Sequence, residues 1–582
     1  MFVLGLNLSF NSAASLWKDE VCIASISEER LTGEKNTKMF PIKAIRTVCD
    51  EARIQGYTID SLTVAYSHYT KLDYDYLKKY NLLPDNLPEN PEDFIKDLIE
   101  RVIDVKVNDI HRVNHHCAHA FSAFAVYGLP KNMDNATILT MDGFGDGISA
   151  CLTVSNKEVA TLPLVKSPAL YYQFVTGALG FKEHQHEGKI TGIASTYREG
   201  YIDRTYCYNS SVAILRHVNF FKSRYSNPDL LMNLSIEETE QADKSNIKDF
   251  DWFLRLRKTI YTYVKDEVLS KCDDYRPDNK VTDYPEVIEL CIAVQVFVEE
   301  VVFDFLINNV TKWTDSIYLA GGMFANVTLN YLFSGYYNHV YISPAMGDEG
   351  TAMGAALRCV MDHSSKLDMD KLYGFHPEYI INAGKSLPER GIAADIDDNI
   401  KAVHTIVHNP TSGFVFYCRE RSEFGPRALM HRSILMSTQH ETLQSRLNKL
   451  MERNEFMPYA PVMLEDTAEA WFQNYKVFKE SCFFMTVALP LKEEKLDNVD
   501  SLGFALHIDC TCRIQTVSLD CPCTEQAARL LYHYGQVTNT KHPVLINTSF
   551  NRHNAPVCAT KDQCLSTWSS IGNLGYITIN KE

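Results

Sequence analysis

Short apolar runs alternate with helix-like patterns through the first part of the chain. The runs have the length and apolar composition of buried strands: Phe2–Leu8, Val21–Ser27, Thr63–Tyr66, Ala136–Asp142, Ser149–Val154 and Ser316–Ala320. Alternation of strands with helices is typical of layered α/β proteins. We therefore predict an α/β fold, and no internal repeat of fixed period is visible in the sequence.

A long helix is predicted from Val287 to Val310, where apolar residues recur at three- and four-residue spacing. The short strand that follows it ends in Gly321-Gly322. Glycines between a strand and a helix allow a ligand to approach the backbone closely. Gly321, Gly322 and the nearby Asn326 are therefore candidate ligand-binding residues.

The chain is several times longer than a usual domain, which predicts at least two domains. The pattern breaks at Asp362–Asp370 and Gly384–Asn399, and new strands begin near Gly413–Tyr417. We place the boundary near residue 370, which gives domains 1–370 and 371–582.

Composition narrows the class of protein. The chain has 57 Lys and Arg against 73 Asp and Glu, a net charge of −16, and 45% hydrophobic residues, as in soluble globular proteins. This balance excludes a broadly basic surface that coats nucleic acid. No run of 18 apolar residues and no basic leader is present, so we expect no membrane span and a cytoplasmic location.

A histidine pair is the first candidate for chemistry. His115 and His119 are four residues apart, so on a helix they share one face and can bind one metal ion. A pair with this spacing is also typical of histidines with a purely structural role.

Two acidic turns follow apolar strands and supply further candidates. Asp142 opens Asp-Gly-Phe-Gly-Asp-Gly, and Asp348 lies in Met-Gly-Asp-Glu-Gly. Glycine beside a carboxylate allows close approach of phosphate, while the carboxylate can bind a metal. Together with the Gly-Gly strand end and the N-terminal hairpin, these turns follow the order found in the actin, hexokinase and sugar-kinase superfamily.

Blocks along most of the chain resemble the O-carbamoyltransferase family, which includes the nodulation, tobramycin and cephalosporin carbamoyltransferases. The N-terminal blocks are NLSFNSAA (7–14), HHCAHAFSAF (115–124), MDGFGDG (141–147), LAGGMFANVTLN (319–330) and SPAMGDEGTAMGAAL (343–357). The C-terminal blocks are SEFGPRALMHRSIL (422–435), FMPYAPVMLED (456–466), HIDCTCRIQ (507–515) and PVLINTSFN (543–551).

The resemblance implies an N-terminal domain similar to those of the actin, hexokinase and sugar-kinase superfamily. It also implies a smaller α/β C-terminal domain similar to the carbamoyl-adenylate-forming fold of tRNA threonylcarbamoyl synthesis. The second domain would form carbamoyl-adenylate from carbamoyl phosphate and ATP, and the first would transfer the carbamoyl group to a hydroxyl. The family's metal, commonly iron, maps onto His115, His119, Asp142 and Asp348. These ligands suit iron, manganese or zinc better than magnesium.

The resemblance also implies roles for further residues. Lys35 matches a family lysine close to the transferred group, where its charge would stabilise the carbamoyl oxygen. Arg427 and Arg432 follow a Gly-Pro turn with a spacing that suits phosphate binding. The remaining adenylate and phosphate positions of the family correspond to Arg513, Asn547 and Ser549.

The chain departs from the family pattern at several positions. Met451 and Met457 occupy places that are usually basic, so either Arg446, Lys449 or Arg453 compensates or the donor differs from carbamoyl phosphate. Asn11 replaces an aspartate and cannot act as a base, which leaves His116 and Asp146 as candidate bases.

Sixteen cysteines in a cytoplasmic chain are expected to be reduced thiols. Four of them form a CxC-x8-CxC pattern that is either a structural zinc site or a set of ordinary buried thiols: Cys510, Cys512, Cys521 and Cys523.

The expected acceptor is a hydroxyl on a metabolite, a sugar or a hydroxymethylated nucleobase or nucleotide. The net charge does not favour long contacts with nucleic acid, and a homodimer remains open. Two alternatives remain: a related acyl-adenylate transferase with another donor, and a nucleotide-binding regulatory protein with a degenerate second domain.

Overall fold

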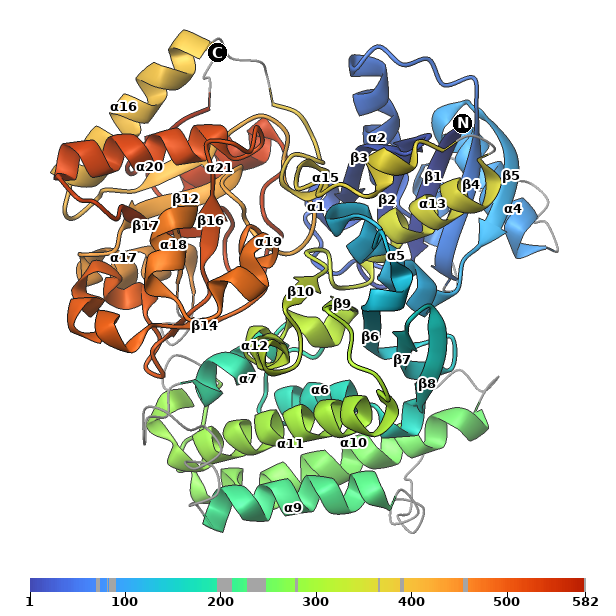
Figure 1. Cartoon of the computed structure of the whole chain (residues 1–582), viewed down its shortest axis with the longest axis horizontal. Helices are drawn as coiled ribbons and strands as arrows, with labels where there is room; N and C mark the ends of the chain where they lie inside the picture. Colours follow the sequence, from blue (N-terminus) through green and yellow to red (C-terminus); the bar gives the residue numbers. More distant parts are fainter. Residues whose placement is uncertain are drawn as a thin grey trace.

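The computed structural model describes residues 1–69, 74–80, 82, 90–195, 212–227, 247–277, 281–364, 367–387, 392–453 and 459–579. Within these ranges the chain forms three large sheets with helices between and around them (Figure 1). The first sheet has the order β3-β2-β1-β4-β5. Its strands are β1 (Phe2–Leu8), β2 (Ala13–Lys18), β3 (Val21–Ser27), β4 (Ser61–Tyr69) and β5 (Lys106–Arg112).

The second sheet has the order β10-β9-β6-β7-β8. Its strands are β6 (Ala136–Gly145), β7 (Ile148–Val154), β8 (Lys157–Pro163), β9 (Ser316–Ala320) and β10 (His339–Ile342). In each sheet the first three strands in sequence form an antiparallel meander, and two later strands add in parallel beside the first. This duplicated arrangement of strands and helices confirms the predicted α/β fold class.

Two helices pack closely between these sheets: α5 (His115–Tyr127) and α13 (Glu349–His363). A Cβ atom on Gly354 of α13 would lie 1.8 Å from the Ala118 carbonyl oxygen of α5. A Cβ atom on Gly5 of β1 would lie 1.9 Å from the Ala352 carbonyl oxygen. Because glycine has no side chain, Gly354 and Gly5 allow α13 to pack directly against α5 and the first sheet.

A helical layer packs on the second sheet (Figure 1). It contains α6 (Pro168–Ala178), α7 (Glu187–Ala194), α9 (Val212–Ser226), α10 (Ile247–Glu267) and α11 (Pro285–Asn309). The predicted helix 287–310 corresponds to α11, and the predicted strand 316–320 is β9. The remaining helices of this half include α1 (Glu28–Thr32), α2 (Ile42–Ile54), α4 (Pro91–Ile103) and α12 (Val327–Leu332).

The third sheet belongs to the C-terminal part and has the order β16-β13-β17-β12-β11-β18. Its strands are β11 (Val415–Cys418), β12 (Arg432–Ser437), β13 (Ala460–Leu464), β16 (Gln515–Val517), β17 (Val544–Ser549) and β18 (Tyr576–Ile577). Helices α16 (Ile392–His408), α17 (Glu441–Met451), α18 (Glu465–Trp471), α20 (Glu525–Thr538) and α21 (Lys561–Ser570) accompany it. A small sheet pairs β14 (Leu489–Pro490) with β15 (Thr511–Cys512).

The N-terminal and C-terminal parts share apolar cores. Phe472 and Phe478 belong to the same buried cluster as Leu139 of the second sheet, and the ring of Phe484 lies 5.9 Å from that of Tyr127 on α5. Beyond residue 370, the chain still contacts the first sheet, because the Ser25 N–H donates to the Ala383 carbonyl. A boundary at residue 370 stays a prediction, and residues from both parts can contribute to one site.

Among the helices described, none combines the length and the apolar character that crossing a lipid bilayer requires.

Candidate functional site

The fold brings two histidines and two aspartates together where the two N-terminal sheets meet. His115 and His119 lie on one face of α5, Asp142 lies near the end of β6, and Asp348 directly precedes α13. Their ligand atoms all lie within 4.8 Å of one another. His119 Nε2 is 3.1 Å from Asp142 Oδ2 and 3.6 Å from Asp348 Oδ1, and His115 Nε2 is 3.6 Å and 3.7 Å from the same atoms.

Neighbouring residues fix the orientation of this cluster. Asp146 Oδ2 accepts a hydrogen bond from the His115 N–H at 2.7 Å, and Ser9 Oγ donates to Asp348 Oδ2 at 3.3 Å. A Cβ atom on Gly145 would lie 2.0 Å from the His115 ring, so glycine leaves space for that imidazole. The cluster is therefore held by both sheets and by α5.

The electrostatics of the cluster suit a divalent cation. Burial raises the pKa of Asp142, but its hydrogen bonds to His115 and His119 and their charge hold it well below the usual range. Burial lowers the pKa of His119, whereas Asp142 and Asp348 raise it to about 9. Two imidazoles beside two carboxylates match the ligand preferences of iron, manganese and zinc, so the residues present fit the implied metal.

The two candidate bases are both engaged in structural contacts. His116 Nδ1 lies 2.9 Å from Thr140 Oγ1 and its Nε2 lies 3.3 Å from the Ile148 carbonyl. Asp146 accepts from Arg112 as well as from the start of α5. Both ring nitrogens of His116 therefore face the second sheet, and Asp146 holds the first N–H of α5. These contacts indicate positioning roles, and a role for either residue as a base stays a prediction.

Asn11 lies beside the cluster in a left-handed backbone conformation, with φ 54°. Its Nδ2 donates to Glu349 Oε2 at 2.8 Å. Burial raises the pKa of Glu349 to about 7. Asn11 therefore holds the carboxylate that follows Asp348.

A group of cations from both parts of the chain forms a second cluster. Burial and the positive charge of Arg427 lower the pKa of Lys35, although Glu29 opposes this. Burial lowers the pKa of Arg427 to about 10, and burial together with Arg427 holds the pKa of Arg513 well below its usual value. Arg427 therefore lies within electrostatic range of both Lys35 and Arg513.

No carboxylate of the described residues offsets the charge of Arg427 or Arg513. The Arg427 Nε atom is buried and makes no hydrogen bond within the described part of the chain. Because positive charges that are partly removed from water and lack an acidic partner are costly, this arrangement favours an anionic ligand.

Arg432 has a different environment from the one predicted. It is fully buried, and its guanidinium donates to backbone carbonyls of Arg419, Glu420, His431, Lys385 and Ala559. These hydrogen bonds indicate a structural role for Arg432, and its contact with phosphate stays a prediction.

Residues of β17 lie near the cation cluster. Asn547 is buried, and its Nδ2 donates to the Ala428 carbonyl and to Gln515 Oε1. Ser549 lies beside Arg453, whose Nη1 donates to Thr548 Oγ1 at 2.7 Å and whose Nη2 donates to the Asn551 carbonyl at 3.0 Å.

The structure separates the three residues proposed to replace the missing basic positions. Met451 is fully buried in the apolar core of the third sheet, and Met457 lies outside the described residues. Lys449 is exposed, and Arg446 donates to the Thr411 carbonyl. Only Arg453, of the three, lies against Ser549, so it is the candidate that compensates.

The Gly-Gly turn lies next to the aspartate-histidine cluster. Gly321 has φ +106°, and its Cβ would lie 2.2 Å from the Met141 carbonyl oxygen. A Cβ on Gly322 would lie 3.0 Å from Asp142 Oδ1. Asn326 caps α12 and exchanges hydrogen bonds with Gln295. Its side chain therefore stabilises this turn.

The four cysteines of the CxC pairs do not converge on one point. Cys512 lies in the core of the second sheet, whereas Cys521 and Cys523 pack against the core that contains α5 and α13. The Sγ atoms of Cys521 and Cys523 are 3.2 Å apart. Among the described residues the four cysteines form no group that could hold a metal.

Sequence reasoning missed the contacts of Ser9, Glu349 and Arg453. Ser9 and Glu349 belong to the N-terminal hairpin and to the Gly-Asp-Glu-Gly turn. For Glu349 the available signal is its place next to Asp348, and for Ser9 it is its place in the N-terminal hairpin. Arg453 was considered only as one of three basic residues, because sequence spacing does not show which one contacts Ser549.

Comparisons with known proteins point to one family over most of the chain. The family described as "Carbamoyltransferase N-terminus" matches residues 3–357, and "Carbamoyltransferase C-terminus" matches residues 411–581. Nodulation protein NolNO of Sinorhizobium fredii is 27% identical over 96% of this chain and 76% of its own. Nodulation protein NolO of Bradyrhizobium diazoefficiens is 26% identical over 78% of this chain and 76% of its own.

Among solved structures, the activator of the 2-hydroxyisocaproyl-CoA dehydratase from Clostridium difficile with bound ADPNP aligns with a TM-score of 0.31 and 11% identity. The alignment covers 62% of this chain and 95% of the activator.

Proposed function

Because the chain belongs to the carbamoyltransferase family, we propose that it is an ATP-dependent O-carbamoyltransferase with two linked sites. Carbamoyl-adenylate forms at the cation cluster of Arg427 and Arg513, and the carbamoyl group passes to an acceptor hydroxyl beside the aspartate-histidine cluster. Lys35, which lies near Arg427, connects the two sites.

One observation carries this proposal: two half-buried arginines without a described carboxylate partner lie within electrostatic range of each other, and Arg427 lies within that range of Lys35, from the other half of the chain. Polyphosphate supplies the negative charge that such a site needs, and arginine binds phosphate through paired N–H donors. Arg453 and Ser549 add donors at the end of β17. The site therefore favours ATP and carbamoyl phosphate together.

The proposed first reaction has two steps. Water cleaves carbamoyl phosphate to carbamate and phosphate, and a carbamate oxygen then attacks the α-phosphorus of ATP. Pyrophosphate leaves, and carbamoyl-adenylate remains. Arg427 and Arg513 bind the phosphate oxygens and stabilise the negative charge that develops on them.

In the second reaction the acceptor oxygen bonds to the carbamoyl carbon, the bond to AMP breaks and the hydroxyl proton is released. Lys35 stabilises charge on the carbamoyl oxygen. His115, His119, Asp142 and Asp348 would hold a divalent metal, for which iron is the expectation from the family. When bound, such an ion polarises a carbonyl or binds a phosphate oxygen.

The acceptor is proposed to be a small molecule or nucleotide with a free hydroxyl. A net charge of −16 does not favour a long nucleic acid. The conversion can be followed as the gain of one carbamoyl group on candidate alcohols by mass spectrometry.

The decisive experiment measures pyrophosphate released from ATP with and without carbamoyl phosphate. We expect donor-dependent release, and its loss in Arg427→Ala. Arg446→Ala is the matched control, because Arg446 is exposed and donates to the Thr411 carbonyl. Release that does not need carbamoyl phosphate, or that persists in Arg427→Ala, would contradict the proposed adenylate step.

A further inference from the structure

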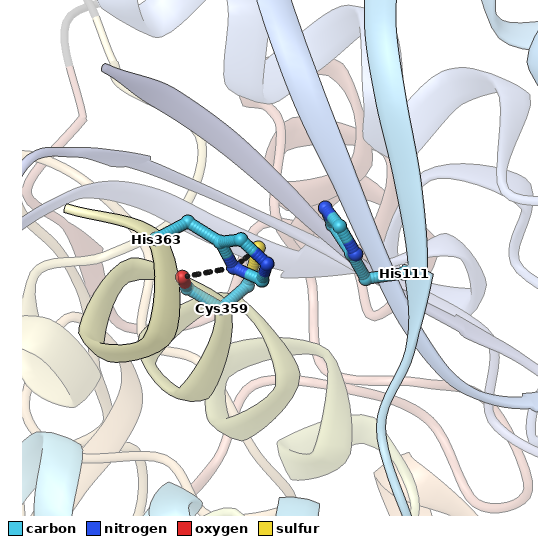
Figure 2. Close-up of side chains that lie close together, drawn as sticks. All are labelled: His111, Cys359 and His363. Atoms are coloured by element: carbon cyan, nitrogen blue, oxygen red, sulfur yellow. Dashed lines mark hydrogen bonds between the residues drawn. The ribbon is translucent and has the colours of Figure 1, made fainter.

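A second group of metal-binding side chains lies at the other end of α13. His111 comes from β5, and Cys359 and His363 come from the last turns of α13. Each offers one ligand atom, and these atoms lie within 4.8 Å of one another. Figure 2 shows the three side chains together between the strand and the helix, with the ring of His111 stacked on that of His363 at 4.0 Å.

The donor types and their spacing suit zinc. Two imidazoles and a thiol are common zinc ligands. Zinc bonds of about 2.0–2.1 Å to nitrogen and about 2.3 Å to sulfur place these atoms roughly 3.6 Å apart in a tetrahedral site. His363 Nδ1 lies 3.6 Å from Cys359 Sγ, although it also lies 3.0 Å from the Cys359 carbonyl, a contact that the ion must replace.

The surroundings supply a carboxylate that orients one ligand and a route by which an ion can enter. Asp109 Oδ2 lies 3.2 Å from His111 Nε2. A carboxylate in this position fixes the proton on Nε2 and leaves Nδ1 free to bind a metal. Cys359 is buried whereas His363 is exposed, so an ion can enter from solvent and keep water as its fourth ligand.

We propose that His111, Cys359 and His363 bind one Zn²⁺ ion, separate from the ion of the aspartate-histidine cluster. Cys359 is eleven residues beyond Asp348, which corresponds to about 16 Å along a helix. The ion joins β5, which leads directly into α5 and His115, to α13, which begins after Asp348. It therefore fastens together the two elements that present ligands to the first cluster.

Cobalt titration of the metal-free full-length protein tests this proposal. A cobalt–thiolate bond gives a charge-transfer absorption in the near ultraviolet, which imidazole and carboxylate ligands alone do not give. We expect this absorption in the wild type and its loss in Cys359→Ser, together with the loss of one equivalent of bound zinc. Cys117→Ser is the matched control, since this half-buried thiol on α5 should leave both readouts unchanged.

A second variant keeps the test informative if Cys359→Ser does not fold. His363→Gln changes an exposed side chain and should weaken zinc binding at this site by at least roughly tenfold, because even indirect partners of a metal contribute that much. His115→Ala should keep the thiolate absorption. Wild-type protein without that absorption, or Cys359→Ser and His363→Gln that retain wild-type binding, would overturn the proposal.

Discussion

Asp146 Oδ2 accepts a hydrogen bond from the backbone N–H of His115 at 2.7 Å, so the turn after β6 fixes the first residue of α5. The same turn region carries Asp142, and α5 carries both histidines of the cluster. The Asp146 carboxylate thus links β6, which carries Asp142, to α5, which carries His115 and His119.

Asp146→Ala should weaken metal binding and lower stability. The substitution leaves a helix-terminal N–H without its acceptor, and loss of such a cap costs about 0.5–2 kcal/mol. Urea unfolding measures the stability change, and metal analysis after dialysis measures the second effect. Asp146→Asn keeps an acceptor oxygen and should recover most of both. Equal metal content in Asp146→Ala and the wild type would contradict this positioning role.

Gly354→Ala should separate α5 from α13. The added methyl would lie 1.8 Å from the Ala118 carbonyl oxygen, and overpacking of a core typically costs about 1–3 kcal/mol. Because α13 follows Asp348 and α5 carries His119, metal content should fall together with the thermal midpoint. Gly335→Ala is the control, since a methyl there meets no atom within 4 Å. A Gly354→Ala protein as stable as Gly335→Ala would show that the helices can move apart freely.

The sequence predicts the strands that are buried along nearly their whole length. The strands β1 and β9 are buried along nearly their whole length, so their apolar runs are visible. By contrast, β5 reads Lys-Val-Asn-Asp-Ile-His-Arg and is largely exposed at a sheet edge, where hydrophobicity gives no signal. The duplication of the sheets also escaped detection, because topology is repeated without a repeated sequence.

The candidate site shows a similar limit. The aspartates and histidines of the cluster were found because each lies at a strand end or on one helix face. The prediction that Arg432 binds phosphate comes from the Gly-Pro turn that precedes it. Sequence does not show that backbone carbonyls already use its donors, nor that Arg453 is the basic residue that reaches Ser549.

Stability should fall as pH rises from about 4.5 to about 7, in part because of Glu28. Burial raises the pKa of this side chain to about 7, although it accepts hydrogen bonds from the N–H groups of Lys43 and Ala44. A carboxyl with a raised folded-state pKa binds its proton more tightly when folded. Its contribution is therefore complete below the unfolded pKa of 4.5 and is lost as pH rises through about 7.

Glu28→Gln should remove this part of the pH dependence, up to roughly 3 kcal/mol between the two limits. Urea unfolding at a series of pH values measures it. Glu34→Gln changes an exposed side chain of the same segment and should keep the wild-type slope. An unchanged slope in Glu28→Gln would mean that other groups produce the pH dependence.

Arg427→Ala and Arg432→Ala should have opposite effects, although the two residues are neighbours in one motif. Arg432→Ala leaves several buried carbonyls without donors, each at a cost of about 1–3 kcal/mol, and should unfold at clearly lower urea concentration. Arg427→Ala removes a half-buried charge without a described carboxylate partner. It should keep or raise stability and lose donor-dependent pyrophosphate release. A destabilised Arg427→Ala with normal release would reverse the two assignments.

His115→Ala should separate the two proposed reactions. The substitution removes one imidazole from the aspartate-histidine cluster, whereas adenylate formation is proposed at the cation cluster. Metal content and carbamoyl transfer should therefore fall at least tenfold while pyrophosphate release continues. Helix α16 offers a matched control, because His404 and His408 have the same four-residue spacing and their rings lie 4.4 Å apart. Both are exposed, and His404→Ala should change neither reaction. If His115→Ala retained full transfer activity, the cluster would have no part in transfer; if it lost pyrophosphate release as well, the two sites would not act independently.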